Sequence, residues 1–100
     1  MGLFGGKKEK KTEKIADYFS AEELQKIRDT IGPKLEANEY GALPQLMAKG
    51  LMDYVGQSEK EFSPGKMKGF MKVAASVKTF EPDLEPILQK AIDKFNSSGS

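Results

Sequence analysis

Apolar side chains recur at helical spacing in four segments of this 100-residue chain, and helix-capping or helix-breaking residues separate the segments. The segments cover residues 21–31, 43–55 and 64–79, and the last one begins between residues 83 and 86. No run of β-branched residues alternates with polar residues, so we expect no sheet. Four or five amphipathic helices joined by short loops predict an all-α fold, a small irregular four- to five-helix bundle.

The clearest boundary is the start of the first long helix. Ser20 and Glu23 stand at the spacing of a capping box, with Ser20 as the N-cap and Glu23 as the third helical residue. Gly32 suits the left-handed residue that follows a helix, and Pro33 disfavours its continuation. We therefore predict that this helix ends at residue 31.

Prolines and glycines also bound the later helices. Pro44 suits the first helical position, N1, of the second helix, and Gly56 suits its end, while Gly50 inside this helix indicates a close helix crossing. Ser63 and Pro64 suit the N-cap and the first residue of the third helix. In the first long helix the apolar face consists of Leu24, Ile27 and Ile31. In the later helices the apolar positions expected to face the core are Leu43, Leu46, Met47, Leu51, Tyr54, Val55, Met67, Phe70, Met71, Val73, Ala74, Val77, Leu84, Ile87, Leu88, Ala91, Ile92 and Phe95.

Composition places these helices in one folded domain. The chain is 38% hydrophobic with a formal net charge of +1, which is too apolar and too neutral for a disordered chain. Residues 1–14 are rich in glycine and lysine, so we expect a flexible basic N-terminal tail there. We assign residues 15–95 to a single helical domain and the Ser- and Gly-rich residues 96–100 to a frayed C-terminal tail.

No stretch of the sequence has the properties of a membrane span or a secretory signal. A run of 18 apolar residues is absent, and the N-terminus places its apolar residues before its lysines, the reverse of a signal peptide. Gly2 stands where a myristoylation site would, but Gly6 replaces the Ser or Thr of that motif. Leu3 and Phe4 are too little apolar surface for more than weak contact with an anionic membrane. Because no cysteine demands an oxidising compartment, we expect a cytoplasmic protein.

The chain contains no histidine, cysteine or tryptophan. It therefore lacks an imidazole for proton transfer near neutral pH, a thiolate nucleophile and the soft ligands that many metals prefer. The acidic residues fall on polar helix faces or caps, and none belongs to a calcium-binding loop. We expect no catalytic residue, no cofactor and no metal, and hence a protein that is not an enzyme. A lysine or tyrosine base would need an apolar pocket.

The third predicted helix is strongly basic within a nearly neutral chain. Residues 63–80 hold Lys66, Lys68, Lys72 and Lys78 and no acidic residue, whereas the first helical region carries more acids than bases. At about 100° per residue, Lys68 and Lys72 share a face of this helix. Three interpretations remain open: a solvated face paired with the chain's own acids, a helix that contacts phosphates, or a surface for an acidic protein.

The start of this basic helix is a candidate anion site. Free backbone amides and the helix dipole favour an anion there, Lys66 adds charge, and Gly65 permits close approach next to Ser63. The spacing does not match a phosphate-binding Gly-x-x-x-x-Gly-Lys loop, so an ordinary capped helix is the alternative interpretation.

Methionines concentrate on the second and third predicted helices. Their side chains adapt to irregular surfaces, so they could line a hydrophobic groove for a partner helix. Core filling between the two helices is the alternative. The residues concerned are Met47, Met52, Met67 and Met71.

These patterns lead to one functional hypothesis and one alternative. We expect a small non-catalytic helical module for protein–protein interaction, an adaptor or regulator whose partner is acidic or amphipathic, or is a second copy of the chain. The alternative is a nucleic-acid-binding accessory protein that contacts phosphates without sequence specificity. The expected partner-binding residues are Lys66, Lys68, Lys72, Met52, Gly65 and Gly69, together with Gly50. The expected tail contacts are Lys7, Lys8, Lys10 and Lys11.

Overall fold

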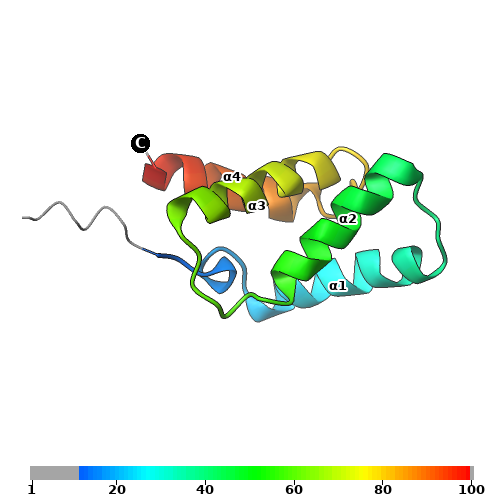
Figure 1. Cartoon of the computed structure of the whole chain (residues 1–100), viewed down its shortest axis with the longest axis horizontal. Coiled ribbons are helices and arrows are strands. Elements are labelled where there is room, and N and C mark those ends of the chain that lie inside the picture. Colours follow the sequence, from blue (N-terminus) through cyan, green and yellow to red (C-terminus); the bar gives the residue numbers. More distant parts are fainter. Residues whose placement is uncertain (1–11, 100) are drawn as a thin grey trace, which may run out of the picture.

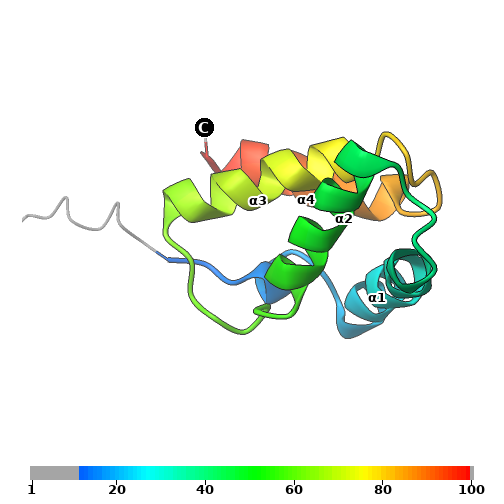
Figure 2. The ribbon, with the colours of Figure 1, turned by 45° about the vertical axis from the view of Figure 1, so that its right-hand side comes forward.

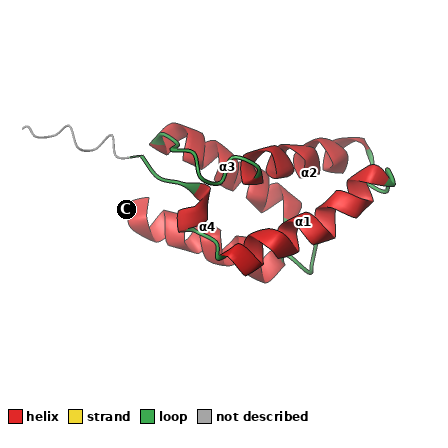
Figure 3. Cartoon of the chain, turned by 90° about the horizontal axis from the view of Figure 1, so that it is seen from below, coloured by secondary structure: helices red, strands yellow, loops and turns green. Residues whose placement is uncertain are grey.

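The structure, a computed structural model, describes residues 12–99. A short 3-10 turn, η2, spans Ile15–Asp17 and precedes four α-helices. The helices are α1 (Ala21–Glu36), α2 (Ala42–Val55), α3 (Pro64–Val77) and α4 (Glu85–Gly99), labelled in Figure 1. Short loops join them, and the described residues contain no β-strand (Figure 3). The prediction of an all-α fold is confirmed.

The helices pack in chain order. α2 packs against both α1 and α3, and α3 packs against α4. α3 and α4 lie side by side, and α2 runs obliquely from them down to α1 (Figures 1 and 2). The sides that face one another form a single core, whose fully buried large side chains include Ile27, Leu51, Phe62, Phe70 and Leu88.

Aromatic rings join four elements at the centre of this core. Phe70 of α3 meets Phe19 with ring centroids 6.0 Å apart and Tyr54 of α2 with centroids 5.4 Å apart, both edge to face. Tyr54 also meets Phe62, 5.8 Å away. Each such pair contributes about 0.5–1.5 kcal/mol beyond its burial, so this cluster fixes α2 and α3 relative to the loops that precede α1 and α3.

Both N-caps predicted from the sequence are present. The Ser20 hydroxyl accepts the Glu23 N–H at 3.1 Å, and the Glu23 carboxylate accepts the Ser20 N–H at 2.9 Å, which completes the capping box. At α3 the Ser63 hydroxyl accepts the Lys66 N–H at 3.2 Å, and proline is the first helical residue.

The predicted end of the first helix is wrong. α1 passes through Gly32 and Pro33 and ends at Glu36. The left-handed residue is Asn38, whose φ is 60°, and its N–H donates to the Leu35 carbonyl at 3.1 Å. The next N–H, that of Glu39, donates to the Lys34 carbonyl at 2.9 Å, so the two bonds form a Schellman motif. The additional turn packs Leu35 against the core and brings Lys34 to Glu81, and these tertiary contacts offset the local cost of the proline.

The predicted core face of α2 is only partly correct. Leu51 and Val55 are buried, and so is Ala48, but Leu43 is 67% exposed and Leu46 is 61% exposed. Neighbouring helices cover one side of α2, whereas the apolar stripe of the sequence is wider than that side. The methionines favour the core-filling interpretation: Met67 and Met71 are buried, and Met47 and Met52 are half-buried against the core.

Ordered structure reaches beyond residues 15–95 at both ends. Glu13 and Phe62 form an isolated antiparallel bridge, with N···O distances of 3.0 and 2.7 Å. Residues 12–14, assigned to the tail by the sequence, thus lie against the loop before α3. At the other end α4 continues through residues 96–99. The tail lysines at positions 7, 8, 10 and 11 lie outside the described residues.

Within residues 12–99, no helix is both long enough and apolar enough to cross a membrane.

Candidate interaction surface

The exposed face of α3 carries Lys68 and Lys72, which form no salt bridge with the described residues. Lys68 and Lys72 are exposed and share one face of the helix, and neither pairs with an acidic residue among the described side chains. The salt bridges within this part of the chain are Lys14–Glu59, Lys34–Glu81 and Lys90–Glu23. The interpretation in which the chain's own acids neutralise α3 therefore gains no support.

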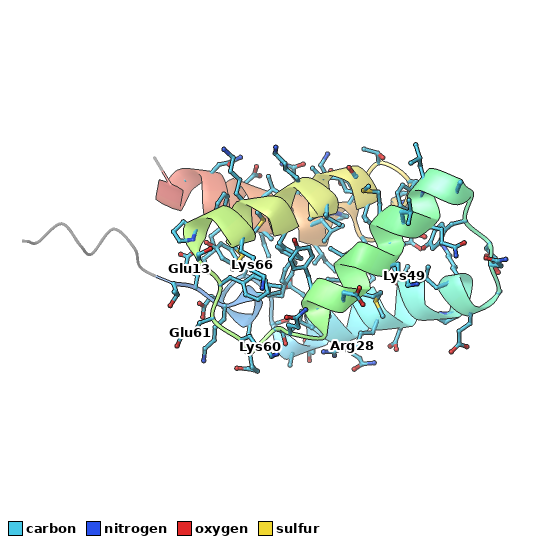
Figure 4. The ribbon with its side chains drawn as sticks, in the orientation of Figure 1. Glu13, Arg28, Lys49, Lys60, Glu61 and Lys66 are labelled. Atoms are coloured by element: carbon cyan, nitrogen blue, oxygen red, sulfur yellow. The ribbon has the colours of Figure 1, made fainter. Side chains whose placement is uncertain are left out.

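Lys66 lies on another side of α3. Its Nζ is 4.8 Å from the centre of the Phe62 ring, a cation–π distance, at the N-terminal end of the helix (Figure 4). At about 100° per residue it lies about 200° around the axis from Lys68. The structure therefore does not bring Lys66, Lys68 and Lys72 together, and the basic face of α3 consists of the last two.

The candidate anion site at the start of α3 has few donors left. Pro64 has no N–H, and the N–H groups of Lys66 and Met67 donate to the Ser63 hydroxyl and carbonyl at 3.2 and 2.9 Å. Among the described residues this leaves the Gly65 amide as the first-turn donor without an acceptor. Gly65 is exposed, with no atom within 4 Å of the space a Cβ would fill. The geometry is that of an ordinary capped helix.

The other predicted partner-binding residues divide between two sides of α2. A Cβ at Gly50 would lie 3.9 Å from Val73, and a Cβ at Gly69 would lie 3.4 Å from the Tyr54 hydroxyl, so both glycines sit where α2 meets α3. Both distances are ordinary van der Waals contacts, which means that this crossing does not require glycine. Met52 lies about 200° around the α2 axis from Gly50, on its opposite side.

Two residues expected in the core instead belong to the surface. Leu43 and Leu46 are the large hydrophobic side chains of the described region that are exposed. They lie on the same side of α2 as Gly50, within an arc of about 60°. The sequence carried a signal for them, since they belong to its apolar stripe, but periodicity alone does not say which part of a stripe the other helices cover.

A buried carboxylate that the sequence did not single out ties three segments together. Glu81, in the loop before α4, is 1% exposed. Its two oxygens accept hydrogen bonds from Lys34 Nζ at 3.0 and 2.9 Å, and one of them also accepts the Tyr40 hydroxyl. The Tyr40 ring packs edge to face on Phe80, 5.4 Å away. The cluster connects the end of α1, the α1–α2 loop and the α3–α4 loop.

The ionisation of this cluster fits a structural role better than catalysis. Burial, reinforced by the hydrogen bond to Glu81, raises the pKa of Tyr40, and the hydrogen bond to Glu81 raises the pKa of Lys34. Both groups are therefore protonated at neutral pH, and neither is poised to act as a general base. Glu81 stands in a Phe-Glu-Pro sequence, a pattern that does not indicate a buried acid. The sequence therefore carried no signal that could have identified Glu81.

An open surface hollow of about 540 Å³ lies between the start of α1 and α4. Lys90 Nζ is 2.6 Å from Glu23 Oε2, a hydrogen bond that contributes most to lowering the pKa of Glu23. Lys94 donates to the Asp17 carbonyl at 2.7 Å and lies 5.3 Å from the centre of the Tyr18 ring. Since each cation already has partners within the chain, the hollow offers no free charge to a ligand.

The described residues contain no group of three or more carboxylate, histidine or cysteine side chains that could hold a metal ion. No family model matches the chain, and neither a curated protein nor a solved structure is significantly similar to it.

Proposed function

We propose that this chain is a small non-catalytic module for protein–protein interaction, whose partner presents acidic groups to α3. The observation that carries the proposal is the pair Lys68 and Lys72: both are exposed, share a face of a helix without acidic residues, and have no ion pair with described residues. Unpaired charges of one sign on a rigid helix steer a partner of the opposite sign and fix its orientation.

The test is a charge reversal with a matched control. A partner is purified from nuclease-treated extract on the full-length chain and titrated against the wild type, K68E/K72E and K26E/K60E. Lys26 and Lys60 are exposed and also lack ion pairs with described residues, so the control changes the net charge equally. We expect about a tenfold or greater loss of affinity for K68E/K72E and less than about a twofold change for the control. Equal losses for both variants would contradict the proposal.

A second candidate function is sequence-nonspecific binding of nucleic acid, which the same two lysines support. α3 contains no arginine, asparagine or glutamine, the side chains that most often read base edges. If phosphates are the ligand, the logarithm of the affinity for a short DNA duplex falls with the logarithm of salt concentration, with a slope of about −0.9 per contact. Absence of duplex binding at low salt would remove this candidate.

A further inference from the structure

We infer that the side of α2 carrying Leu43 and Leu46, together with the adjoining part of α3, is a docking surface for an acidic amphipathic helix. This inference rests on the proposed function, because it specifies the acidic partner and the place where it is anchored. The starting observation is the exposure of the two leucines, 67% and 61%, in a chain that buries or half-buries its other large apolar side chains within the described region.

The surface around the leucines is continuous across two helices. Gly50 follows them on the same side of α2 and lies against Val73 of α3, with 3.9 Å between the Val73 methyl and the position of a Cβ on Gly50. One turn before Val73 on α3 is Gly69. We call the residues Leu43, Leu46, Gly50, Gly69 and Val73 the α2–α3 face. Its exposed apolar side chains, Leu43 and Leu46, stand at the α2 end, and its glycines lie where α2 packs against α3.

Lysines border this face on both sides. Lys49 projects from the middle of α2 (Figure 4), about 60° around the axis from Leu46. On α3 the neighbour of Val73 is Lys72. Both lysines are exposed and neither has an ion pair with the described residues. Asp53, one turn beyond Lys49, is the acidic residue on this side of α2, about 20° around the axis from Leu46 and about two turns further along the helix.

This arrangement selects the chemistry of the partner. An apolar strip with cations along both borders complements a helix that has an apolar ridge at i, i+3 and i+7 and carboxylates on its two flanks. Each helix beneath the face has 14 residues and so is about 21 Å long, which matches a partner helix of about four turns. A second copy of the chain is less suitable, since its own face would bring lysines against lysines.

The probe for the test is a designed peptide of about four helical turns, with a leucine ridge and glutamates on both flanks. Its control has the same ridge with lysines replacing the glutamates. Each peptide is titrated into the ¹⁵N-labelled full-length chain, and amide shifts are recorded by NMR. We expect the glutamate peptide to shift amides of residues 42–50 and 69–76, and the lysine peptide to leave them unchanged. No shift in these segments, or equal shifts with both peptides, would overturn the inference.

Two surface variants then separate this inference from the proposed function. L43S/L46S removes the apolar anchor from exposed positions, so it should keep the wild-type melting temperature and bind the glutamate peptide about tenfold more weakly. Both variants are also titrated with the partner purified from extract. If L43S/L46S binds this partner like the wild type while K68E/K72E loses binding, the inference fails and the proposed function stands. If neither variant weakens binding of the partner, both fail. If sedimentation shows that the wild-type chain is a dimer and that L43S/L46S is a monomer, the α2–α3 face serves self-association and the inference is overturned.

Discussion

Lys34 at the end of α1 and Glu81 in the loop before α4 are 47 residues apart in the sequence and form an ion pair with 2.9 Å between Nζ and Oε2. The carboxylate is buried, whereas the lysine side chain is 39% exposed. The pair therefore joins a fully desolvated acid to a cation that can also be hydrated. With Tyr40 as the third member, it holds the two loops that close this end of the molecule.

The two partners of this pair should not be equivalent under substitution. Lys34→Met removes the cation from the buried Glu81 side chain and leaves Tyr40 as its side-chain hydrogen-bond partner, so we expect a loss of about 3 kcal/mol in the free energy of unfolding. Glu81→Gln removes the buried charge and leaves Lys34 free to turn toward water, so we expect a smaller loss of about 1–2 kcal/mol. Chemical denaturation measures both, with Glu36→Gln on the exposed side of α1 as the control. A larger loss for Glu81→Gln than for Lys34→Met would contradict this account.

Stability should fall at alkaline pH because of the same cluster. The pKa values of Lys34 and Tyr40 are raised in the folded state, so their protonated forms are favoured by folding. Their contribution to the free energy of unfolding is complete below the pKa values of the unfolded state, which are near 10. It is lost as the pH rises through the higher pKa values of the folded state. Urea unfolding between pH 8 and 11 should show that the free energy of unfolding declines as the pH rises, and that this decline is weaker in Tyr40→Phe.

The control for the alkaline decline is Tyr54→Phe, a half-buried tyrosine whose ring packs in the core. It should keep the wild-type decline. Tyr18, whose pKa is also raised by burial and by its hydrogen bond to Glu13, adds a parallel decline that both variants retain. Identical pH profiles for Tyr40→Phe and the wild type would show that the Tyr40–Glu81 contact does not govern alkaline stability.

Two substitutions near the end of α1 should change the free energy of unfolding in opposite directions. Gly32 lies inside the helix with open space where a Cβ would be, so Gly32→Ala should stabilise the protein by about 0.5–1 kcal/mol. Asn38 has a left-handed backbone, so Asn38→Ala should destabilise it by about 1 kcal/mol. Thermal or urea unfolding measures both. If Gly32 were the residue that ends the helix, the sign for Gly32→Ala would be reversed.

The α2–α3 crossing should tolerate a methyl group at Gly50. The new Cβ would lie 3.9 Å from Val73, an ordinary contact, and alanine favours a helix interior. We therefore expect Gly50→Ala to raise the free energy of unfolding by about 0.5–1 kcal/mol. Urea denaturation of this single variant measures the change. A destabilisation would mean that the crossing depends on glycine, as the sequence alone suggested.

The sequence by itself determined where α1 and α3 begin, whereas α2 begins at Ala42, so that Pro44 is its third residue and not its first. The hydroxyls of Ser20 and Ser63 reach N–H groups three residues ahead, so these caps are local and can be read without the fold. Tertiary structure decided where α1 ends. The additional turn packs Leu35 against the core and forms the Lys34–Glu81 pair, and these contacts outweigh the intrinsic penalty of Pro33 inside a helix.

Tertiary structure also decided which apolar residues are exposed. Leu43 and Leu51 belong to one stripe of the sequence, yet only Leu51 is covered, since α1 and α3 reach one part of α2 and not the other. The burial of Glu81 has the same origin: its partners lie more than 40 residues away in the chain, at Lys34 and Tyr40. Capping is a short-range interaction that composition and spacing encode directly, whereas burial depends on neighbours that only folding brings together.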